Sequence, residues 1–301
     1  MTTEEEILEQ AEPFSEDNQS ANVKEYFDGQ SVLFQDGKFS ILKNNEDQEG
    51  FVYQGDLQQG IREGKGIQHY PDGSTYEGTW RKNKAHGKGK LVLPSGDFYE
   101  GDWENNKAQG YGTFCNTGGS VYQGFWKENK PHGFGKEVWE DGSKYEGEYK
   151  HGLKEGQGSF CFADESIYSG QWKANKMSGW GKYEEDNGKV YEGEWLDGKY
   201  HGEGCLTLPN GVRYEGMFMH GARHGYGIEN DKDTVFKGNW VGDKKHGFGV
   251  YVSGIGRSGD RTELKGYWEK GEFVQRITET ERDLGGKSLR GDSDHFDGMM
   301  D

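Results

Sequence analysis

Histidine is the residue type that best combines chemical capacity with regular spacing in this 301-residue chain. A histidine can bind a metal ion or transfer a proton near neutral pH. Ligands of one metal ion must lie about 3 Å apart, whereas equivalent positions of adjacent β-hairpins lie about 10 Å apart, two strand spacings. We therefore expect these side chains to form hydrogen bonds in turns and to bind no metal. Five of them share one position of a repeated pattern: His86, His132, His201, His224 and His246.

Three other groups of residues have the letters of a chemical site without its context. Residues 254–259 match a dinucleotide-binding glycine motif, but that motif works only between a strand and a helix, and here strands are expected on both sides. Glu184, Glu185 and Asp186 precede an Asn-Gly turn and indicate a solvated loop. No Ser or Cys has a single His and a single acid that stand out as its partners. We expect no enzymatic activity, no cofactor and no metal.

The cysteines show neither the spacing of a metal site nor a close pair that suggests a disulfide framework. Cys115 and Cys161 each follow a phenylalanine in an expected strand, at a place that Val92 holds in a neighbouring unit. We expect all three cysteines, Cys205 included, to be small buried hydrophobic residues in a reducing compartment.

Composition excludes several classes of protein. Hydrophobic residues make up 31% of the chain and aromatic residues 14%, with 51 Gly, 5 Pro and a mean hydropathy of −1.07. Too few aliphatic side chains are present to fill one deep core. Most of the net charge of −17 lies in residues 1–50 and 271–301, so no basic surface for nucleic acid is expected. Neither a signal peptide nor a membrane span is apparent, and we expect an intracellular protein.

A tandem repeat dominates residues 51–270. The pattern aromatic-x-Gly-x-aromatic, with occasional substitutions in its first and last places, recurs every 23 residues from Tyr53 to Tyr214. Looser copies follow at Phe236 and Leu264. A Gly-x-Gly pair follows every copy except the last. These spacings predict an array of about ten units.

Each unit has the pattern of a β-hairpin. In Tyr76-Glu77-Gly78-Thr79-Trp80 the two aromatic residues and the glycine share one face of a strand, because side chains alternate. The glycine leaves space for a neighbouring ring to lie across the backbone. Turn dipeptides join the units. The predicted fold is all-β: an elongated, twisted, single-layer antiparallel sheet of tandem hairpins, with flexible acidic ends.

These residues resemble the MORN-repeat family, and the resemblance covers residues 51–270. Departures from the pattern include Leu57 and Tyr149 at the Trp place and Phe236 and Leu264 at the Tyr place, which we attribute mainly to capping units. The residues that match and that we expect to be structural are Tyr76, Gly78, Trp80, Tyr99, Gly101, Trp103, Tyr191, Gly193 and Trp195.

The chain divides into four expected segments. Residues 1–25 form an acidic disordered segment, residues 26–50 a capping hairpin, residues 51–270 the repeat array and residues 271–301 a flexible acidic tail. Phe273–Leu284 is expected to form a short helix in the tail, and residues 253–261 are expected to form a glycine-rich excursion within the array.

The middle residue of Gly-x-Gly is the candidate partner-binding position. It is aromatic in five of the nine pairs, and alternation places it opposite the flanking glycines. Two interpretations stay open: the rings pack against a neighbouring strand, or they form an exposed ladder that receives a partner protein. The residues are Tyr111, Phe134, Trp180, Tyr226 and Phe248.

The resemblance implies a non-catalytic structural scaffold for protein–protein interaction. Stand-alone arrays of this length with acidic flanks are most similar to radial spoke head proteins, which places the expected partners in the axoneme of a cilium or flagellum, within the cytoskeleton. Self-association through the array ends is also expected. Related repeats in methyltransferases precede a catalytic domain, for which residues 271–301 are too few.

The alternative function is a phospholipid-binding module that tethers membranes, because such repeats also accompany phosphoinositide kinases. It would need a basic face. The main candidate is a single turn with Arg81, Lys82, Lys84, Lys88 and Lys90, with Lys244 and Lys245 as a weaker one.

Overall fold

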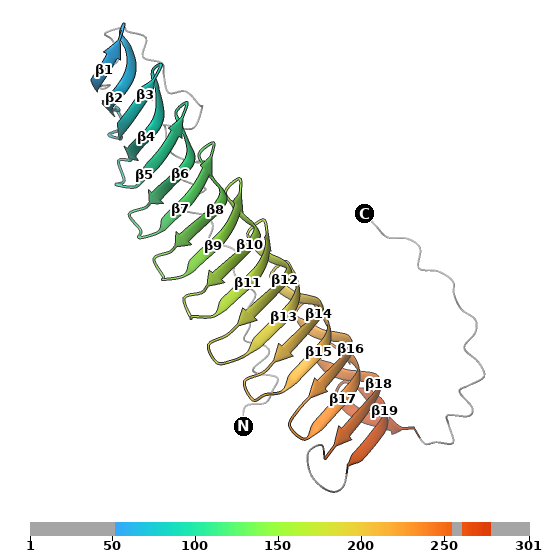
Figure 1. Cartoon of the computed structure of the whole chain (residues 1–301). Coiled ribbons are helices and arrows are strands. Elements are labelled where there is room, and N and C mark those ends of the chain that lie inside the picture. The colour runs from blue at the N-terminus through green and yellow to red at the C-terminus, as the bar shows by residue number, and fades with distance from the viewer. Residues whose placement is uncertain (1–51, 255–260, 278–301) are drawn as a thin grey trace, which may run out of the picture. The chain divides into compact units, whose positions relative to one another are not determined.

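The computed structural model describes residues 52–254 and 261–277. Within these ranges the chain consists of β-strands and turns, without a helix, which confirms the all-β prediction. It forms two compact units, one ending at Pro209 and the other beginning at Asn210 (Figure 1). No helix in the described ranges is long and apolar enough to cross a membrane.

The strands of the first unit are β1 (Val52–Gln58), β2 (Ile61–His69), β3 (Thr75–Arg81), β4 (Lys84–Val92), β5 (Phe98–Glu104), β6 (Lys107–Cys115), β7 (Val121–Lys127), β8 (Lys130–Val138), β9 (Lys144–Lys150), β10 (Leu153–Cys161), β11 (Ile167–Lys173), β12 (Lys176–Glu184), β13 (Val190–Leu196) and β14 (Lys199–Thr207). Those of the second unit are β15 (Arg213–Met219), β16 (Ala222–Asn230), β17 (Thr234–Val241), β18 (Lys244–Ser253), β19 (Thr262–Glu269) and β20 (Glu272–Arg276).

Within each unit every strand pairs antiparallel with the next strand in the sequence. The register aligns the repeat glycines: Gly89 pairs with Gly101, and Gly101 pairs with Gly112. This glycine row crosses the first unit from β1 to β14. Figure 1 shows the strands of this unit side by side, their direction changing gradually, as expected of a twisted sheet.

The core is one layer of aromatic rings lying over the glycine row. The hydroxyl of Tyr99 donates to the carbonyl of Asp102 at 2.9 Å, and the indole N–H of Trp103 donates to the carbonyl of Gly89 in the preceding hairpin at 2.9 Å. The rings of Tyr99 and Trp103 meet edge to face, with centroids 5.2 Å apart. Tyr99 meets Trp126 of the next hairpin in the same way, at 5.0 Å. Each ring therefore connects two hairpins.

The hairpin turns add a second connection between neighbours. Asn106 lies in the left-handed region at φ 68°, which Asn tolerates better than most residues. Its side-chain oxygen accepts the N–H of Ala85 at 2.7 Å, and its own N–H donates to the carbonyl of Ala85 at 3.0 Å. Asn83, Asn129 and Asn175 form the same bonds to the preceding hairpin.

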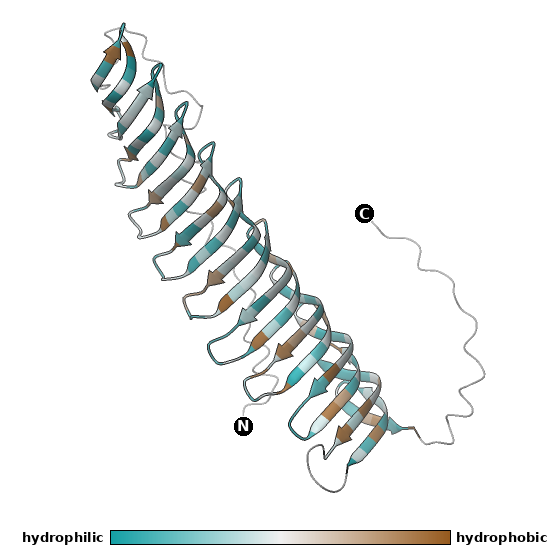
Figure 2. Ribbon diagram, viewed as in Figure 1, coloured by the Kyte–Doolittle hydropathy of each residue, from teal (hydrophilic) through white to brown (hydrophobic). Residues whose placement is uncertain are grey.

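Figure 2 shows short hydrophobic segments on separate strands in place of a continuous band. The reason is that Tyr and Trp, which fill the core, are amphipathic side chains with a polar group. This arrangement explains how a chain with 31% hydrophobic residues forms a sheet of this size.

Three expectations need correction, and others lie outside the described residues. The array does not end at residue 270, and no helix begins at Phe273, because Glu272–Arg276 forms β20, with Phe273 opposite Trp268. Nor are Cys115, Cys161 and Cys205 fully buried. Alternation places them on the face opposite the rings, where burial is partial. The expected disordered segment, capping hairpin and most of the acidic tail and glycine-rich excursion fall on residues 1–51, 278–301 and 255–260.

Candidate interaction surface

The face opposite the core rings, which we call the outer face, carries the five aromatic residues singled out from the sequence. Their side chains are between 44% and 57% exposed. The structure places them in separate units: three in the first, on β6, β8 and β12, and two in the second, on β16 and β18. In that order they are Tyr111, Phe134, Trp180, Tyr226 and Phe248.

In the first unit the rings lie in one line across the strands. Tyr111 pairs with Phe125 of β7, and the two rings meet edge to face with centroids 5.5 Å apart. Phe134 pairs with Glu148, and Trp180 with Glu194. We call this line the outer row: Asp102, Tyr111, Phe125, Phe134, Glu148, Gln157, Gln171, Trp180 and Glu194.

Phe125 is the residue of this row that the sequence interpretation missed. It is 51% exposed and lies at the fourth place of its repeat pattern, where most other hairpins of the first unit have an acid or amide. In those hairpins the side chain accepts a backbone N–H at the bulge of the partner strand, as Asp102 does for Tyr111 at 2.9 Å. The equivalent acceptors are Asp56, Glu148, Gln171 and Glu194.

A phenylalanine ring cannot accept this hydrogen bond. At Phe125 the chain therefore has an exposed ring in place of a stabilising polar contact. Tyr111, Phe125 and Phe134 consequently form an apolar cluster on three adjacent strands, β6 to β8. A contiguous exposed cluster of this kind marks an interaction site more often than scattered apolar residues do. The signal that could have found it is the change from acid to ring within the repeat.

Packing between strands accounts for only part of the outer aromatic surface. Tyr111 contacts Phe125, and Phe248 contacts Tyr267 with centroids 6.0 Å apart, yet all four rings stay between 44% and 51% exposed. In the second unit the exposed line comprises Met217, Tyr226, Phe248 and Tyr267. Both sequence interpretations thus describe part of the geometry, and exposure dominates.

The charges of the outer face are mostly paired. Lys88 contacts Asp102 at 2.6 Å, and Lys90 contacts Glu100 at 3.2 Å, so two members of the basic turn face acids of β5. In contrast, Glu148 and Glu194 have no ion-pair partner in the described part of the chain. The outer row from Phe125 to Glu194 therefore carries net negative charge and contains no Lys or Arg.

A buried polar cluster interrupts the core at the middle of the first unit. Tyr149, which replaces the usual Trp, donates its hydroxyl to Glu137 at 2.8 Å. Lys154 lies under four rings, with its ammonium nitrogen 4.6 Å from the centroid of Trp139. Burial raises the pKa of Glu137 and lowers the pKa of Lys154, while the charge of each opposes the shift of the other. The replacement of Trp by Tyr149 is thus accompanied by two polar neighbours, Glu137 and Lys154, in the buried core. It is not a feature of an end cap.

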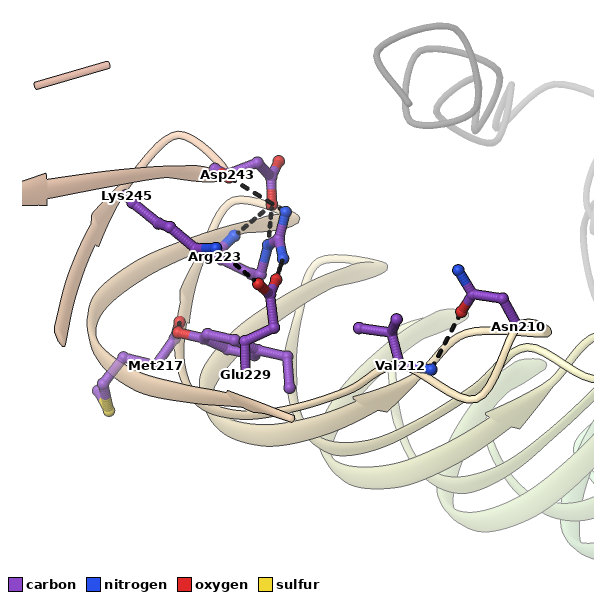
Figure 3. A network of polar contacts seen from close by, with 8 residues as sticks. Asn210, Val212, Met217, Arg223, Glu229, Asp243 and Lys245 are labelled. Atoms are coloured by element: carbon purple, nitrogen blue, oxygen red, sulfur yellow. Dashed lines mark hydrogen bonds and ion pairs between the residues drawn. The ribbon is translucent and has the colours of Figure 1, made fainter. Parts of the chain in front are cut away.

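A related cluster stabilises the second unit (Figure 3). Arg223 contacts Glu229 at 2.6 Å and Asp243 at 3.2 Å, and Lys245 contacts Glu229 at 2.9 Å. The guanidinium of Arg223 also lies 4.3 Å from the ring centroid of Trp240. Because every charge here faces an opposite charge or a ring, the cluster holds neighbouring hairpins together.

The repeat histidines lie on separate hairpins. The ring of His132 has its centroid 5.3 Å from that of His151, and burial, with nearby positive charge, lowers the pKa of His132. In residues 52–254 and 261–277, no group of three or more His, Cys, Asp or Glu side chains is placed to hold a metal ion. The glycine motif at 254–259 falls almost wholly outside these ranges.

Comparison with known proteins identifies the repeat. The family model described as "MORN repeat" matches nine segments: 53–75, 76–98, 99–121, 122–144, 145–167, 168–189, 191–213, 214–233 and 236–256. The tenth unit expected from the sequence, β19 and β20, lies beyond the last match. No curated protein matches this chain.

Two solved structures show weak likeness. One is the SAS-4 (dCPAP) TCP domain in complex with a proline-rich motif of Ana2 (dSTIL) of Drosophila melanogaster, 12% identical, with a TM-score of 0.34, covering 54% of this chain and 86% of that one. The other is a streptogramin B lyase, 11% identical, with a TM-score of 0.15, covering 73% and 89%. Likeness at this level carries no argument about function.

Proposed function

The chain belongs to the MORN-repeat family, and from this membership we propose that it is a non-catalytic scaffold that binds other proteins of a ciliary or flagellar axoneme, as a component of a radial spoke head. MORN repeats are in general a non-catalytic, repeat-based interaction module. The observation that carries the proposal is the line of exposed rings on the outer face, with its cluster at Tyr111, Phe125 and Phe134.

A single-layer repeat array offers a large surface for binding. A single-layer sheet buries little per residue, and each hairpin of the array adds another strip of outer face. Aromatic side chains supply contact area at a low entropic cost, because they have few rotatable bonds. Rings repeated at the same place of successive hairpins therefore suit a partner that follows several hairpins.

The axonemal assignment rests on the resemblance of this repeat array, with acidic segments on both sides, to radial spoke head proteins. It implies a cytoskeletal location, and partners that are other axonemal proteins. Self-association belongs to the same proposal: among the described residues β1 pairs with β2 and β20 pairs with β19, so each array end offers an edge strand.

The test is a pull-down from solubilised axonemes with the tagged full chain, followed by mass spectrometry. A variant with all five Gly-x-Gly rings changed to Ser, shown to be folded by circular dichroism, runs beside it. Recovery of spoke proteins by the wild type alone supports both the assignment and the surface. If the wild type and the variant recover the same spoke proteins, the scaffold function is supported but binding through the five rings is contradicted. Recovery of no axonemal protein contradicts the axonemal assignment.

The phospholipid alternative has less support. It depends on the basic turn, where Lys88 and Lys90 already face Asp102 and Glu100. Sedimentation with vesicles that contain phosphatidylinositol bisphosphate tests it: binding that disappears when Arg81, Lys82 and Lys84 are changed to Gln would favour the alternative.

A further inference from the structure

We propose that the outer row of the first unit binds a basic, proline-rich segment of a partner protein in the polyproline II conformation. This inference rests on the proposed scaffold function and specifies the chemistry of the partner. Three observations carry it: the spacing of equivalent residues along the row, the polar groups among the rings and the charge of the row.

The spacing comes from the sheet itself. Tyr111, Phe134, Gln157 and Trp180 occupy the same place in four successive hairpins, two strands apart. Two strand spacings are about 9.6 Å. A polyproline II helix advances about 9.3 Å per turn of three residues. Every third residue of such a segment, laid across the strands, therefore meets the next hairpin.

Spacing also discriminates against an α-helix. An α-helix turns the same face toward a surface every seven residues, which corresponds to a rise of about 10.5 Å along its axis. Over the three steps from Tyr111 to Trp180 the helix is out of register by about 3 Å, whereas polyproline II differs by about 1 Å. The sheet also twists, and polyproline II has no internal hydrogen bonds to break when it bends with the surface.

The polar groups of the row suit a backbone without internal hydrogen bonds. A polyproline II segment leaves its carbonyl oxygens free, and proline carries no N–H. Tyr111 and Trp180 are about half exposed and carry a hydroxyl and an indole N–H, and Gln157 between them is exposed and carries an amide. These groups can donate to carbonyls while the rings pack against proline, as in aromatic-lined proline-binding grooves.

The charge specifies the remaining residues of the ligand. Glu148 and Glu194 lie beside Phe134 and Trp180, respectively, without an ion-pair partner in the described residues. Lys136, the nearest base on β8, already contacts Glu146 at 2.9 Å. Arg or Lys among the prolines would complement the row, and acidic residues would be repelled.

The experiment titrates the full chain into fluorescein-labelled peptides and follows fluorescence anisotropy. The test peptide repeats Pro-Pro-Arg over about twelve residues, which spans the row. One comparison peptide has the same number of arginines on an alanine-rich helix, and another replaces Arg by Glu. We expect binding of the Pro-Pro-Arg peptide alone. Equal binding of the helical peptide would overturn the polyproline II conformation, and absence of binding would overturn the proposal.

Variants of the chain distinguish binding of the peptide at the outer row from nonspecific attraction of a basic peptide to an acidic protein. Tyr111→Ser/Phe134→Ser/Trp180→Ser should weaken binding tenfold or more, whereas Ile167→Ser/Leu196→Ser, which removes exposed apolar side chains outside the row, should leave it unchanged. Similar weakening by both would overturn the assignment to the row.

The charge is tested with Glu148→Gln/Glu194→Gln. Gln keeps the acceptor of the backbone hydrogen bond, as Gln171 does in the natural chain, so the fold is maintained. We expect several-fold weaker binding and a smaller loss of affinity on going from low to physiological salt. Unchanged affinity at low salt would contradict charge recognition.

The scaffold proposal and the polyproline II proposal can be contradicted independently of each other. If the triple Ser variant loses its partners in the axonemal pull-down while the wild type binds no Pro-Pro-Arg peptide, the scaffold stands and the ligand chemistry is wrong. If the peptide binds to the row but no axonemal protein is recovered, the ligand chemistry stands and the cellular assignment is wrong.

Discussion

The hydroxyl of each repeat tyrosine donates to a main-chain carbonyl three residues further on, and this bond can be tested one atom at a time. Tyr122 donates to the carbonyl of Phe125 at 2.9 Å. Tyr122→Phe keeps the ring over the glycines but leaves this carbonyl without its partner. We expect the free energy of unfolding, measured by urea titration, to fall by about 1 kcal/mol. Phe236, at the equivalent place in the second unit, provides the reverse change: Phe236→Tyr should stabilise.

The cluster of Glu137, Tyr149 and Lys154 makes a second prediction at the residue scale. Either Glu137→Leu or Lys154→Ala alone leaves a buried charge unpaired and should cost about 3–5 kcal/mol. Leu91, Trp80 and Ala85 hold the places of Glu137, Tyr149 and Lys154 elsewhere in the array, so the triple variant Glu137→Leu/Tyr149→Trp/Lys154→Ala restores the usual pattern and leaves no tyrosine hydroxyl without its acceptor. It should be as stable as the wild type or more stable by about 1–4 kcal/mol. A triple variant less stable than both single variants would contradict this.

The same cluster sets a pH dependence whose sign follows from burial. The pKa of Glu137 is raised in the folded state, so above its ordinary value of 4.5 the folded chain binds more protons than the unfolded chain. Stability from this group is therefore present at low pH and is lost as the pH rises through the raised pKa. Lys154 acts with the opposite sign, because its pKa is lowered in the folded state. Lys154→Ala removes that contribution, so this single variant should gain stability relative to the triple variant when urea titrations are repeated from pH 7 down toward pH 5.

At the scale of the element, the turn of each hairpin connects it to the one before. Asn106→Gly removes the side-chain bond to the N–H of Ala85 while keeping a residue that tolerates φ 68°. We expect a loss of about 1 kcal/mol, and faster hydrogen exchange of the Ala85 amide. Asn187→Gly is the control for loss of a turn asparagine that connects no hairpins, because the Asn187 side chain bonds only to Lys189 and Glu185 of its own loop.

Hairpins are also the scale at which the sequence was most informative. The 23-residue period and strand alternation correctly predicted the pairing of strands, the buried face and the position of Tyr111 on the opposite face, because these follow from backbone geometry. The sequence left open whether the ring of Tyr111 is packed or exposed. The cluster around Phe125 was not predicted, since it depends on a bulge at which Phe125 stands in place of the usual acid or amide acceptor. The departure at Tyr149 was left without an explanation of its own, because nothing in the period reveals that Glu137 and Lys154 meet it in space.

At the scale of the whole molecule, stability should come from contacts between neighbours, and the position of a defect should determine how far it spreads. A side chain at Gly101 would clash with the backbone of Gly112 and with the hydroxyl of Tyr99, 2.7 Å from its first carbon. A side chain at Gly266 would clash similarly with Gln275 and Phe273, but its hairpin, β19 and β20, has a neighbouring hairpin on one side only among the described residues. Gly101→Val should therefore lower the melting temperature more than Gly266→Val.

Hydrogen exchange resolves this difference along the chain. Gly101→Val should lose protection in the hairpins on both sides of its own, from β3 to β8, whereas Gly266→Val should lose it in its own hairpin, β19 and β20, and in the one neighbouring hairpin, β17 and β18. Gly118→Ala is the control: its new carbon meets only the side chain of Asn116, at 3.3 Å, and φ there is not in the left-handed region. Equal melting temperatures and equal spread for the two Val variants would mean that the hairpins unfold as one cooperative body, because the loss would then be independent of the number of neighbours.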